Sequence, residues 1–246
     1  EAHQKFGTLP WRELIAPAVE YAEKGFTVAD KQHQYRDDAL KLFNGTTNFT
    51  EYFGSMKPGE IFRQPELAAT LRRIADQGPD DFYSGKTAGL LVAQMQADQG
   101  LITRQDLLDY KVVWREPLRY DWRGNSLYTA PPPSSGGVAL MQLMSIKEAR
   151  AAEFDGVALN SAKYIHLLAE IEKRVFADRA DYLGDPDFTE VPVQQLTDPA
   201  YLERRATEVN PAAISATVEV RPGLEPHQTT HFSIVDADGN AVSNTF

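Results

Sequence analysis

Residues 229–242 read TTHFSIVDADGNAV, and this stretch decides how the end of the chain folds. Polar and apolar residues alternate on both sides of an Asp-Gly pair, a pattern typical of two antiparallel strands joined by a tight turn. It predicts a β-hairpin with strands over 229–235 and 241–246 and a turn over 236–240. The first strand would begin with clustered hydroxyl groups, directly after a polar linker at 219–228.

The hydroxyl groups at the start of this strand are candidates for chemistry. A hydroxyl at its ordinary pKa is a poor nucleophile and needs a base held against it. Thr229 and His231 are two residues apart, so in an extended strand both side chains leave the same face and could hydrogen-bond. A threonine-rich strand start is also a common structural feature, and the residues alone leave both interpretations open.

The composition of the whole chain limits the folds and functions that it can have. Its 246 residues are 42% hydrophobic, enough for one large domain or two small ones. The chain has 35 acidic against 25 basic residues and no cluster of basic residues. It therefore lacks the positive charge with which proteins bind nucleic acid independently of its base sequence. No apolar run approaches the roughly 18 residues of a membrane-spanning helix. The absence of cysteine excludes disulfides, thiolate-zinc sites and a cysteine nucleophile.

Helical periodicity dominates the residues before the linker. Helices are expected over 10–24, 29–43, 65–78, 84–100, 138–146, 161–182, 199–206 and 211–216, with a loop over 44–59. A second hairpin is expected, with strands 118–122 and 127–129 around a turn at 123–126, and Thr103 with Asp106 resembles a capping box. In helix 161–182 the apolar stripe consists of Tyr164, Leu168, Ile171, Val175 and Tyr182. Glu170, Lys173 and Arg174 lie outside this stripe. The residues therefore predict a mixed α and β fold that is rich in helix.

Three further groups of residues could carry chemistry. Gly136 and Gly137 follow two serines and open a helix, so their N–H groups could bind an anion, although a rigid turn set by the preceding prolines explains them equally. Four aspartates between 178 and 187 could bind a hard cation or act as acid and base, but their spacing matches no calcium loop, and such residues also serve helix ends and turns. The five histidines are scattered, so we expect no metal site.

Several separate motifs occur in a fixed order along the chain. Besides 229–242 they are 16–18 (APA), 57–60 (KPGE), 101–107 (LITRQDL), 131–137 (PPPSSGG) and 177–186 (ADRADYLGDP). From near residue 5 to the end, the chain resembles gamma-glutamyltranspeptidase, a family of N-terminal nucleophile hydrolases made as one precursor that cuts itself into two subunits. The resemblance implies an α/β fold of the αββα sandwich type, of which this chain is expected to be the helix-rich portion of an incomplete domain. Residues 1–228 would be the C-terminal part of the large subunit, and 229–246 the start of the small subunit.

The resemblance also implies an activity and a nucleophile. Thr229 matches the first threonine of the family's small subunit, so it is the expected nucleophile, and the bond between Gln228 and Thr229 is the expected site of autocatalytic cleavage. The expected reaction passes the γ-glutamyl group of glutathione or another γ-glutamyl amide, through an ester on Thr229, to water or to an acceptor amino acid or peptide. It requires no cofactor. His231 then becomes a strand residue rather than a base, and the aspartate cluster becomes mainly architectural.

Two alternatives stay open. One is an acylase of the same superfamily that cleaves a glutaryl-type amide, as in cephalosporin acylases, and the other is a noncatalytic fragment. The residues that bind the substrate are expected outside this chain, with the remainder of the small subunit, so substrate-binding residues are unknown and the isolated chain is expected to be inactive. Because family members are typically exported or anchored on the cell surface, a periplasmic or secreted location is expected.

Overall fold

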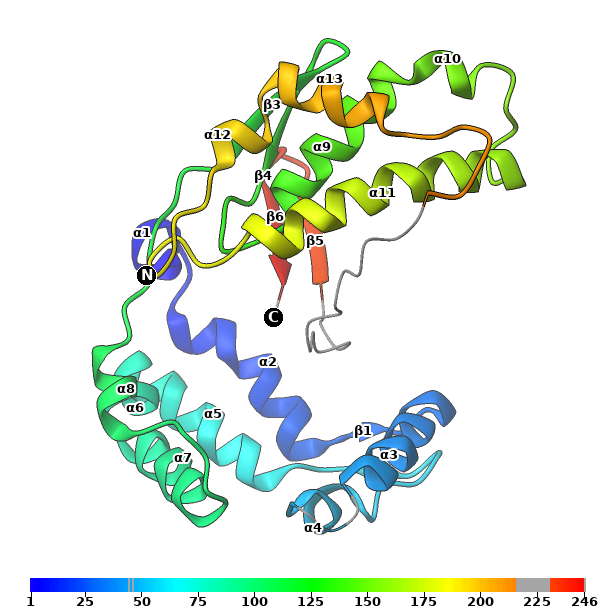
Figure 1. Cartoon of the computed structure of the whole chain (residues 1–246). Helices are drawn as coiled ribbons and strands as arrows, with labels where there is room; N and C mark the ends of the chain where they lie inside the picture. Colours follow the sequence, from blue (N-terminus) through cyan, green and yellow to red (C-terminus); the bar gives the residue numbers. More distant parts are fainter. Residues whose placement is uncertain (44, 46, 216–230, 246) are drawn as a thin grey trace. The chain divides into compact units, whose positions relative to one another are not determined.

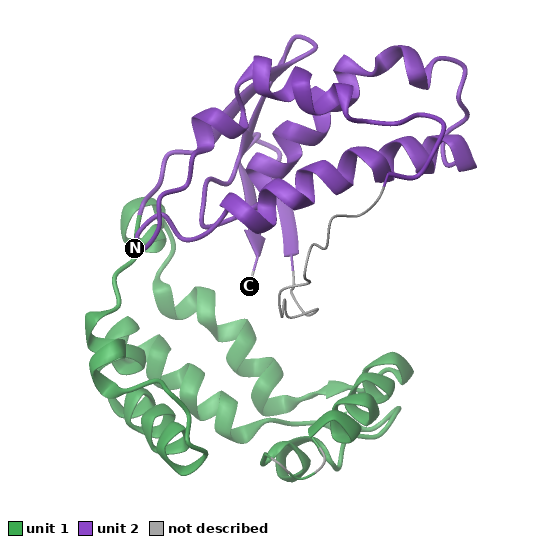
Figure 2. Cartoon of the chain, in the orientation of Figure 1, with its two compact units in different colours: residues 1–113 green, residues 114–246 purple. Residues whose placement is uncertain are grey.

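The computed structural model describes residues 1–43, 45, 47–215 and 231–245. The chain divides into two compact units, Glu1–Val113 and Trp114–Phe246 (Figure 2). Helices predominate, and every sheet among the described residues has two antiparallel strands, so the mixed, helix-rich class predicted from the sequence is confirmed. No helix in the described part of the chain has the length and hydropathy that crossing a membrane requires.

Unit 1 consists mainly of helices connected by short segments (Figure 1). Helix α2 packs along α5, and Trp11 of α2 donates a hydrogen bond from Nε1 to the carbonyl of Ile74 in α5 (2.9 Å). Helix α2 continues through Pro17 and ends at Gly25, whose φ of 84° is a conformation that glycine adopts readily. The helices of unit 1 are α1 Ala2–Phe6, α2 Trp11–Lys24, α3 Asp30–Phe43, α4 Phe49–Phe53, α5 Pro65–Gln77, α6 Pro79–Tyr83, α7 Lys86–Ala97 and α8 Arg104–Asp109.

A small aromatic core lies beside a short ladder in unit 1. Strand β1 (Phe26–Thr27) pairs with β2 (Ile61–Phe62), which places Phe26 opposite Phe62. Helix α4 lies within the segment 44–59, where a loop was expected, so that expectation was wrong. Its Phe49 and Phe53 rings stack with centroids 4.7 Å apart, and Phe53 also packs near Phe62. Contact with the aromatic core stabilises a turn of helix in a segment whose glycine and asparagine content favours a loop.

Local side-chain hydrogen bonds fix two helix starts in unit 1. The capping box predicted at Thr103 and Asp106 is confirmed: the Asp106 N–H donates to the Thr103 hydroxyl (3.3 Å), and the Thr103 N–H donates to the Asp106 carboxylate (2.7 Å). At the start of α7, the buried Asp81 carboxylate accepts hydrogen bonds from the N–H groups of Lys86 (3.1 Å) and Thr87 (3.4 Å). Each carboxylate satisfies N–H groups that a helix leaves unpaired at its N-terminus.

Unit 2 contains a hairpin, a core of packed helices and a second hairpin near the end of the chain. In the first hairpin, Arg123 and Gly124 have φ of 49° and 78° and form a two-residue turn. Asn125 and Ser126 therefore belong to the second strand, which corrects the longer turn expected over 123–126. The elements are β3 Leu118–Trp122, β4 Asn125–Thr129, α9 Gly136–Ala149, α10 Ala151–Phe154, α11 Ala162–Tyr182, α12 Val193–Leu196, α13 Pro199–Thr207, β5 His231–Val235 and β6 Ala241–Thr245.

The apolar core of unit 2 forms where α9 and its neighbours α11 and α13 meet. Ile146 of α9, Ile171 and Val175 of α11 and Leu202 of α13 are at most 5% exposed. Burial of such side chains stabilises a fold by about 1.5–3 kcal/mol each. Ile171 and Val175 belong to the apolar stripe that the sequence predicts for this helix, whereas Tyr182, at the end of that stripe, is 49% exposed.

Helix α11 also buries a charge that its apolar stripe does not predict. Glu170 is 1% exposed, although it lies outside the stripe. Its carboxylate accepts hydrogen bonds from Lys173 Nζ (2.6 Å), Arg174 Nη1 (2.9 Å) and the N–H of Ser215 (3.1 Å). Burial works to raise the pKa of Glu170, but the hydrogen bonds from Lys173, Ser215 and Arg174 outweigh it and lower the pKa to about 2. The carboxylate is therefore ionised at neutral pH, and its charge is paired.

The helix expected over 211–216 is absent from residues 211–215, and Ala216 lies outside the described residues. The side chain of Asn210 accepts hydrogen bonds from the N–H groups of Ala212 (2.9 Å) and Ala213 (3.1 Å). Because the asparagine side chain offers the backbone a local alternative to helical hydrogen bonds, residues 211–215 form a turn instead of a helix.

We expect Gly137→Ala to lower the free energy of unfolding by about 1–3 kcal/mol. A Cβ at Gly137 would overlap the carbonyl oxygen of Ala130 and lie 3.0 Å from Thr129 Cγ2, so backbone would have to move. Gly136→Ala is the matched control, because its Cβ would lie 3.6 Å from the nearest atom, Ser134 Oγ. Urea unfolding of the full-length protein measures both variants, and equal destabilisation would contradict the packing argument.

We expect Glu170→Gln to destabilise the protein at pH 7 by about 2–4 kcal/mol, since it leaves two partly buried cations without their buried carboxylate. The pKa of Glu170 is lowered on folding, so its contribution is complete above the ordinary pKa of 4.5 and is lost as the pH falls towards about 2. The difference in unfolding free energy between wild type and variant should therefore shrink across this range. Denaturant unfolding at several pH values tests this, with Glu148→Gln, in an exposed pair with Arg123, as the control. A difference independent of pH would exclude the assigned role of the ionised carboxylate.

Candidate active site

The two residues expected to carry the chemistry, Gln228 and Thr229, lie outside the described residues. The structure describes the chain from His231, where β5 begins. Strands β5 and β6 pair antiparallel with His231 opposite Thr245 and Ser233 opposite Ser243, so the predicted hairpin is confirmed over its described length.

One face of this hairpin is a continuous set of polar side chains. His231 Nδ1 lies 2.7 Å from Thr245 Oγ1, and His231 Nε2 lies 3.2 Å from the hydroxyls of both Ser233 and Ser243. Both ring nitrogens therefore have hydroxyl partners on the hairpin itself. These contacts agree with His231 acting as a strand residue that links β5 to β6.

The turn of the hairpin is held by a single carboxylate. Asp236 Oδ1 accepts hydrogen bonds from the N–H groups of Asp238 (3.0 Å) and Asn240 (2.9 Å), and Asp236 Oδ2 accepts from the side-chain amide of Asn240 (2.9 Å). The hydrogen bonds from Asn240 lower the pKa of Asp236 more than any other contact. All ten residues of β5 and β6 are exposed, so local hydrogen bonds rather than burial within this chain set the hairpin's conformation.

The glycine pair opens α9 as expected, but the groups around it have protein partners. The N–H of Gly136 lies 3.4 Å from Ser134 Oγ, and Ser135 Oγ accepts a hydrogen bond from Arg179 Nε (2.8 Å). Gly137 is buried against the Ala130 carbonyl. The motif 131–137 connects β4 to α9, and its Ser135 is hydrogen-bonded to Arg179 of α11. Arg179 belongs to the motif 177–186, and the sequence does not predict this contact between the two motifs. The arrangement agrees with the interpretation of this motif as a rigid turn.

The aspartate cluster is distributed among structural partners. Asp178, 6% exposed, accepts hydrogen bonds from Arg205 Nη2 (2.8 Å) and Gln142 Nε2 (3.0 Å), whereas Asp187 pairs with Arg115 (2.7 Å). Tyr201 shares this environment: burial, followed by its hydrogen bond to Asp178, raises its pKa. Among the described residues, no three histidine, aspartate or glutamate side chains come together as metal ligands would.

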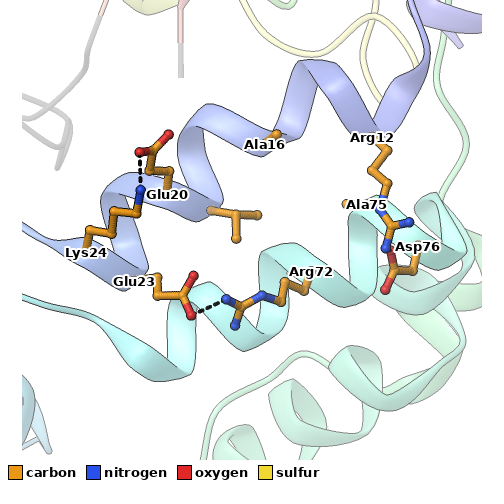
Figure 3. Close-up of a pocket in the computed structure, with 9 residues that line it drawn as sticks. Arg12, Ala16, Glu20, Glu23, Lys24, Arg72, Ala75 and Asp76 are labelled. Carbon is orange, nitrogen blue, oxygen red and sulfur yellow. Dashed lines mark hydrogen bonds and ion pairs between the residues drawn. The ribbon is translucent and has the colours of Figure 1, made fainter.

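A groove of about 380 Å³ lies between α2 and α5 in unit 1 (Figure 3). Ala16, Val19 and Ala75 contribute its apolar lining. Of the described residues that line it, none carries a hydroxyl or imidazole group, so the groove holds no candidate nucleophile or base for acyl transfer. Its charged side chains form three ion pairs, Arg12 with Asp76, Lys24 with Glu20 and Arg72 with Glu23, which leave the lining electrically balanced.

The sequence places the charged residues of α11 outside the apolar stripe but does not predict their burial or their contacts with Ser215. Glu170, Lys173 and Arg174 lie at the i, i+3 and i+4 positions that place side chains on one helix face. That spacing is visible in the sequence, but it is equally typical of a solvent-exposed helix. Only the packed structure shows that these residues are buried or half-buried around Ser215.

The chain has clear relatives among known proteins. The model of the family described as Gamma-glutamyltranspeptidase matches residues 1–246. The chain is 76% identical over 246 residues to "Glutathione hydrolase proenzyme" of Pseudomonas aeruginosa, covering 100% of this chain and 44% of that protein. It is 38% identical over 249 residues to "Acylase ACY 1 proenzyme" of Pseudomonas sp. SE83, again covering 100% of this chain and 44% of the relative. The chain thus spans less than half the length of these curated relatives.

A solved structure shares the fold. The gamma-glutamyltranspeptidase from Pseudomonas nitroreducens complexed with L-DON matches with a TM-score of 0.86 and 71% sequence identity, over 91% of this chain and 67% of that chain. The α/β class with the N-terminal nucleophile hydrolase architecture is therefore confirmed, and the described residues supply the helix-rich part of it. Since the family model matches every residue and the fold is that of a solved family member, the chain belongs to the gamma-glutamyltranspeptidase family.

Proposed function

We propose that the full-length protein is a γ-glutamyl acyltransferase and hydrolase that acts on glutathione and other γ-glutamyl amides. The observation that carries this proposal is 76% identity across the whole chain to a protein named glutathione hydrolase proenzyme. The word proenzyme in that name also supports a precursor that is cut, as the resemblance implies for the bond between Gln228 and Thr229.

Self-cleavage follows from the chemistry of a threonine next to a peptide bond. The Thr229 hydroxyl attacks the Gln228 carbonyl carbon, the bond from that carbon to the Thr229 nitrogen breaks, and the hydroxyl proton passes to the released amine. Water then opens the ester, which gives a carboxylate at Gln228 and regenerates the Thr229 hydroxyl. Residues 1–228 thus belong to the large subunit and 229–246 begin the small subunit.

Cleavage creates the base that the nucleophile needs. A free α-amine has a reference pKa of about 7.7–8.0, so a useful fraction is unprotonated near neutrality. This amine takes the proton of the Thr229 hydroxyl as it attacks the γ-carbonyl of the substrate, which forms a γ-glutamyl ester and releases the amine half. Water or the amine of an acceptor amino acid or peptide then attacks the ester. No step requires a metal or a cofactor, or His231, whose ring contacts hydroxyls on its own hairpin.

The remainder of the small subunit is the proposed partner that completes the substrate pocket, since the relatives are more than twice as long as this chain. Export to the periplasm or the exterior is the proposed location, on the basis of the family resemblance.

A glutaryl-type acylase is the second candidate. It is favoured by the acylase relatives, but these are 38–40% identical to the chain against 76% for the glutathione hydrolase. Both activities use the same nucleophile and differ in the substrate's α-amino group. A noncatalytic role is the third possibility, and the threonine kept at the processing position argues against it.

We expect Thr229→Ala in the full-length protein to abolish cleavage and to lower turnover of a γ-glutamyl anilide by about three orders of magnitude or more, because both reactions use the same hydroxyl. Intact-mass analysis and N-terminal sequencing of the small fragment measure the first effect. His231→Gln is the comparison, since it alters the hairpin close to Thr229 without removing the nucleophile, and it should retain most activity. An uncut Thr229→Ala chain that turned over substrate normally would exclude this mechanism.

We expect the full-length protein to prefer a γ-glutamyl anilide over a glutaryl anilide by at least about a hundredfold in kcat/KM. A site that binds the α-ammonium group leaves its own polar groups unpaired when that group is absent. Comparing the two anilides on one enzyme preparation makes this measurement. A preference for the glutaryl compound would identify an acylase, and no turnover of either would favour the noncatalytic alternative.

A further inference from the structure

A groove of about 380 Å³ lies in unit 2 between β3, α9 and α10 (Figure 1). Its apolar walls are Trp122 of β3, Met144 of α9 and Phe154 of α10. The volume falls within the range of about 300–1,000 Å³ in which proteins bind small molecules. We call this site the Trp122 groove.

Four charged side chains line the Trp122 groove, and two of them neutralise each other. Arg123 donates from Nη2 (2.8 Å) and Nε (3.1 Å) to Glu148 Oε2, and its guanidinium group lies 4.9 Å from the centroid of the Trp122 ring. Lys147 and Asp155 are the other two, and neither forms an ion pair with any described residue. The groove therefore presents one uncompensated positive and one uncompensated negative charge.

Aromatic rings hold the Lys147 side chain in place. Its Nζ lies 5.2 Å from the centroid of the Phe154 ring and 5.1 Å from that of Tyr164, and it donates a hydrogen bond to the Tyr164 hydroxyl (3.1 Å). The two rings meet edge to face, and Phe154 packs against the apolar core of unit 2. Because an ammonium group has three N–H donors, Lys147 keeps donors for a ligand after its contact with Tyr164.

These charges and walls select the chemistry of a ligand. A simple anion that approached Lys147 would be repelled by Asp155, and a simple cation that approached Asp155 would be repelled by Lys147. A ligand with one charge of each sign satisfies both side chains, and an aromatic group packs favourably against Trp122 and Phe154. A peptide terminus carries only one of the two charges, whereas a free α-amino acid carries both on one carbon atom.

We propose that the Trp122 groove binds a free α-amino acid with an aromatic side chain. The carboxylate of the amino acid pairs with the Lys147 ammonium group, its ammonium group pairs with the Asp155 carboxylate, and its ring packs against Trp122 and Phe154. Binding uses only described residues and forms no covalent bond, so it goes beyond the proposed function and does not depend on it.

Titration of the full-length protein with three related probes, followed by ligand-observed NMR, tests the charge assignment. L-phenylalanine carries both charges, 3-phenylpropanoate carries only the carboxylate, and 2-phenylethylamine carries only the ammonium group. We expect L-phenylalanine to bind with a Kd of about 1 mM, which is ordinary for a ligand of its size. Each analogue should bind about fivefold more weakly, because it leaves one groove charge unpaired and meets that charge as a like charge.

Two variants should change these affinities in a crossed pattern. Lys147→Met should weaken L-phenylalanine about fivefold but not 2-phenylethylamine, which has no carboxylate to lose a partner. Asp155→Asn should weaken L-phenylalanine to a similar extent but not 3-phenylpropanoate. Lys147→Arg should keep most of the affinity, and Lys163→Met, at an exposed lysine of α11, is the matched control.

The probe that each variant still binds shows that the groove remains folded. Asp155 is exposed, so Asp155→Asn keeps the test decisive if Lys147→Met does not fold. Equal affinity for L-phenylalanine in the wild type and both variants would overturn the inference, because the amino acid would then bind elsewhere, the catalytic site included. No binding at about 10 mM would overturn it as well. Either result leaves the proposed function intact, which turnover of a γ-glutamyl anilide reports separately.

Discussion

The paired burial of the Glu170 carboxylate is the constraint on which the end of unit 2 depends. A charge that is 1% exposed persists only where cations and hydrogen-bond donors compensate its lost hydration. Lys173 and Arg174 provide that compensation, and the same two cations reach the backbone of residues 208–215. One buried charge on α11 therefore determines both the conformation of its neighbours and the course of the chain after α13. The apolar contacts of Ile171 and Val175 hold α11 in the core of unit 2, whereas Glu170 and its two cations hold residues 208–215 against α11.

Different kinds of interaction stabilise the described residues before and after the proposed cleavage site. On the upstream side, Ser215 is fixed by non-local contacts to a packed helix. On the downstream side, the hairpin of β5 and β6 is set by a ladder, by the Asp236 turn and by hydrogen bonds from His231 to hydroxyls on both strands. A packed unit and a self-contained hairpin thus flank the segment that contains Gln228 and Thr229.

Features with local causes were predictable from the sequence. The helical stripe of α11, the capping box at Thr103 and Asp106 and the hairpin around the Asp-Gly turn depend on residues within a few positions of each other, and all are present. Predictions failed where partners distant in sequence intervene. Helix α4 depends on the contact between Phe53 and Phe62, and Glu170 is buried because Ser215, 45 residues later, returns to it. For the candidate active site, the family resemblance indicates Gln228 and Thr229, which lie outside the described residues, and the structure describes the chain again from His231.

By itself, the sequence determined the family, the candidate nucleophile and the class of fold, because ordered motifs and hydrophobic periodicity are properties of the chain read in one dimension. Tertiary structure alone decided which charged residues are buried, that Gly137 must lack a side chain beneath Ala130, and that the chain before the proposed cleavage site is held at Ser215. The physical reason is that the energy of a charge or a methyl group depends on its surroundings. Those surroundings are assembled from residues far apart in the sequence, which no local pattern records.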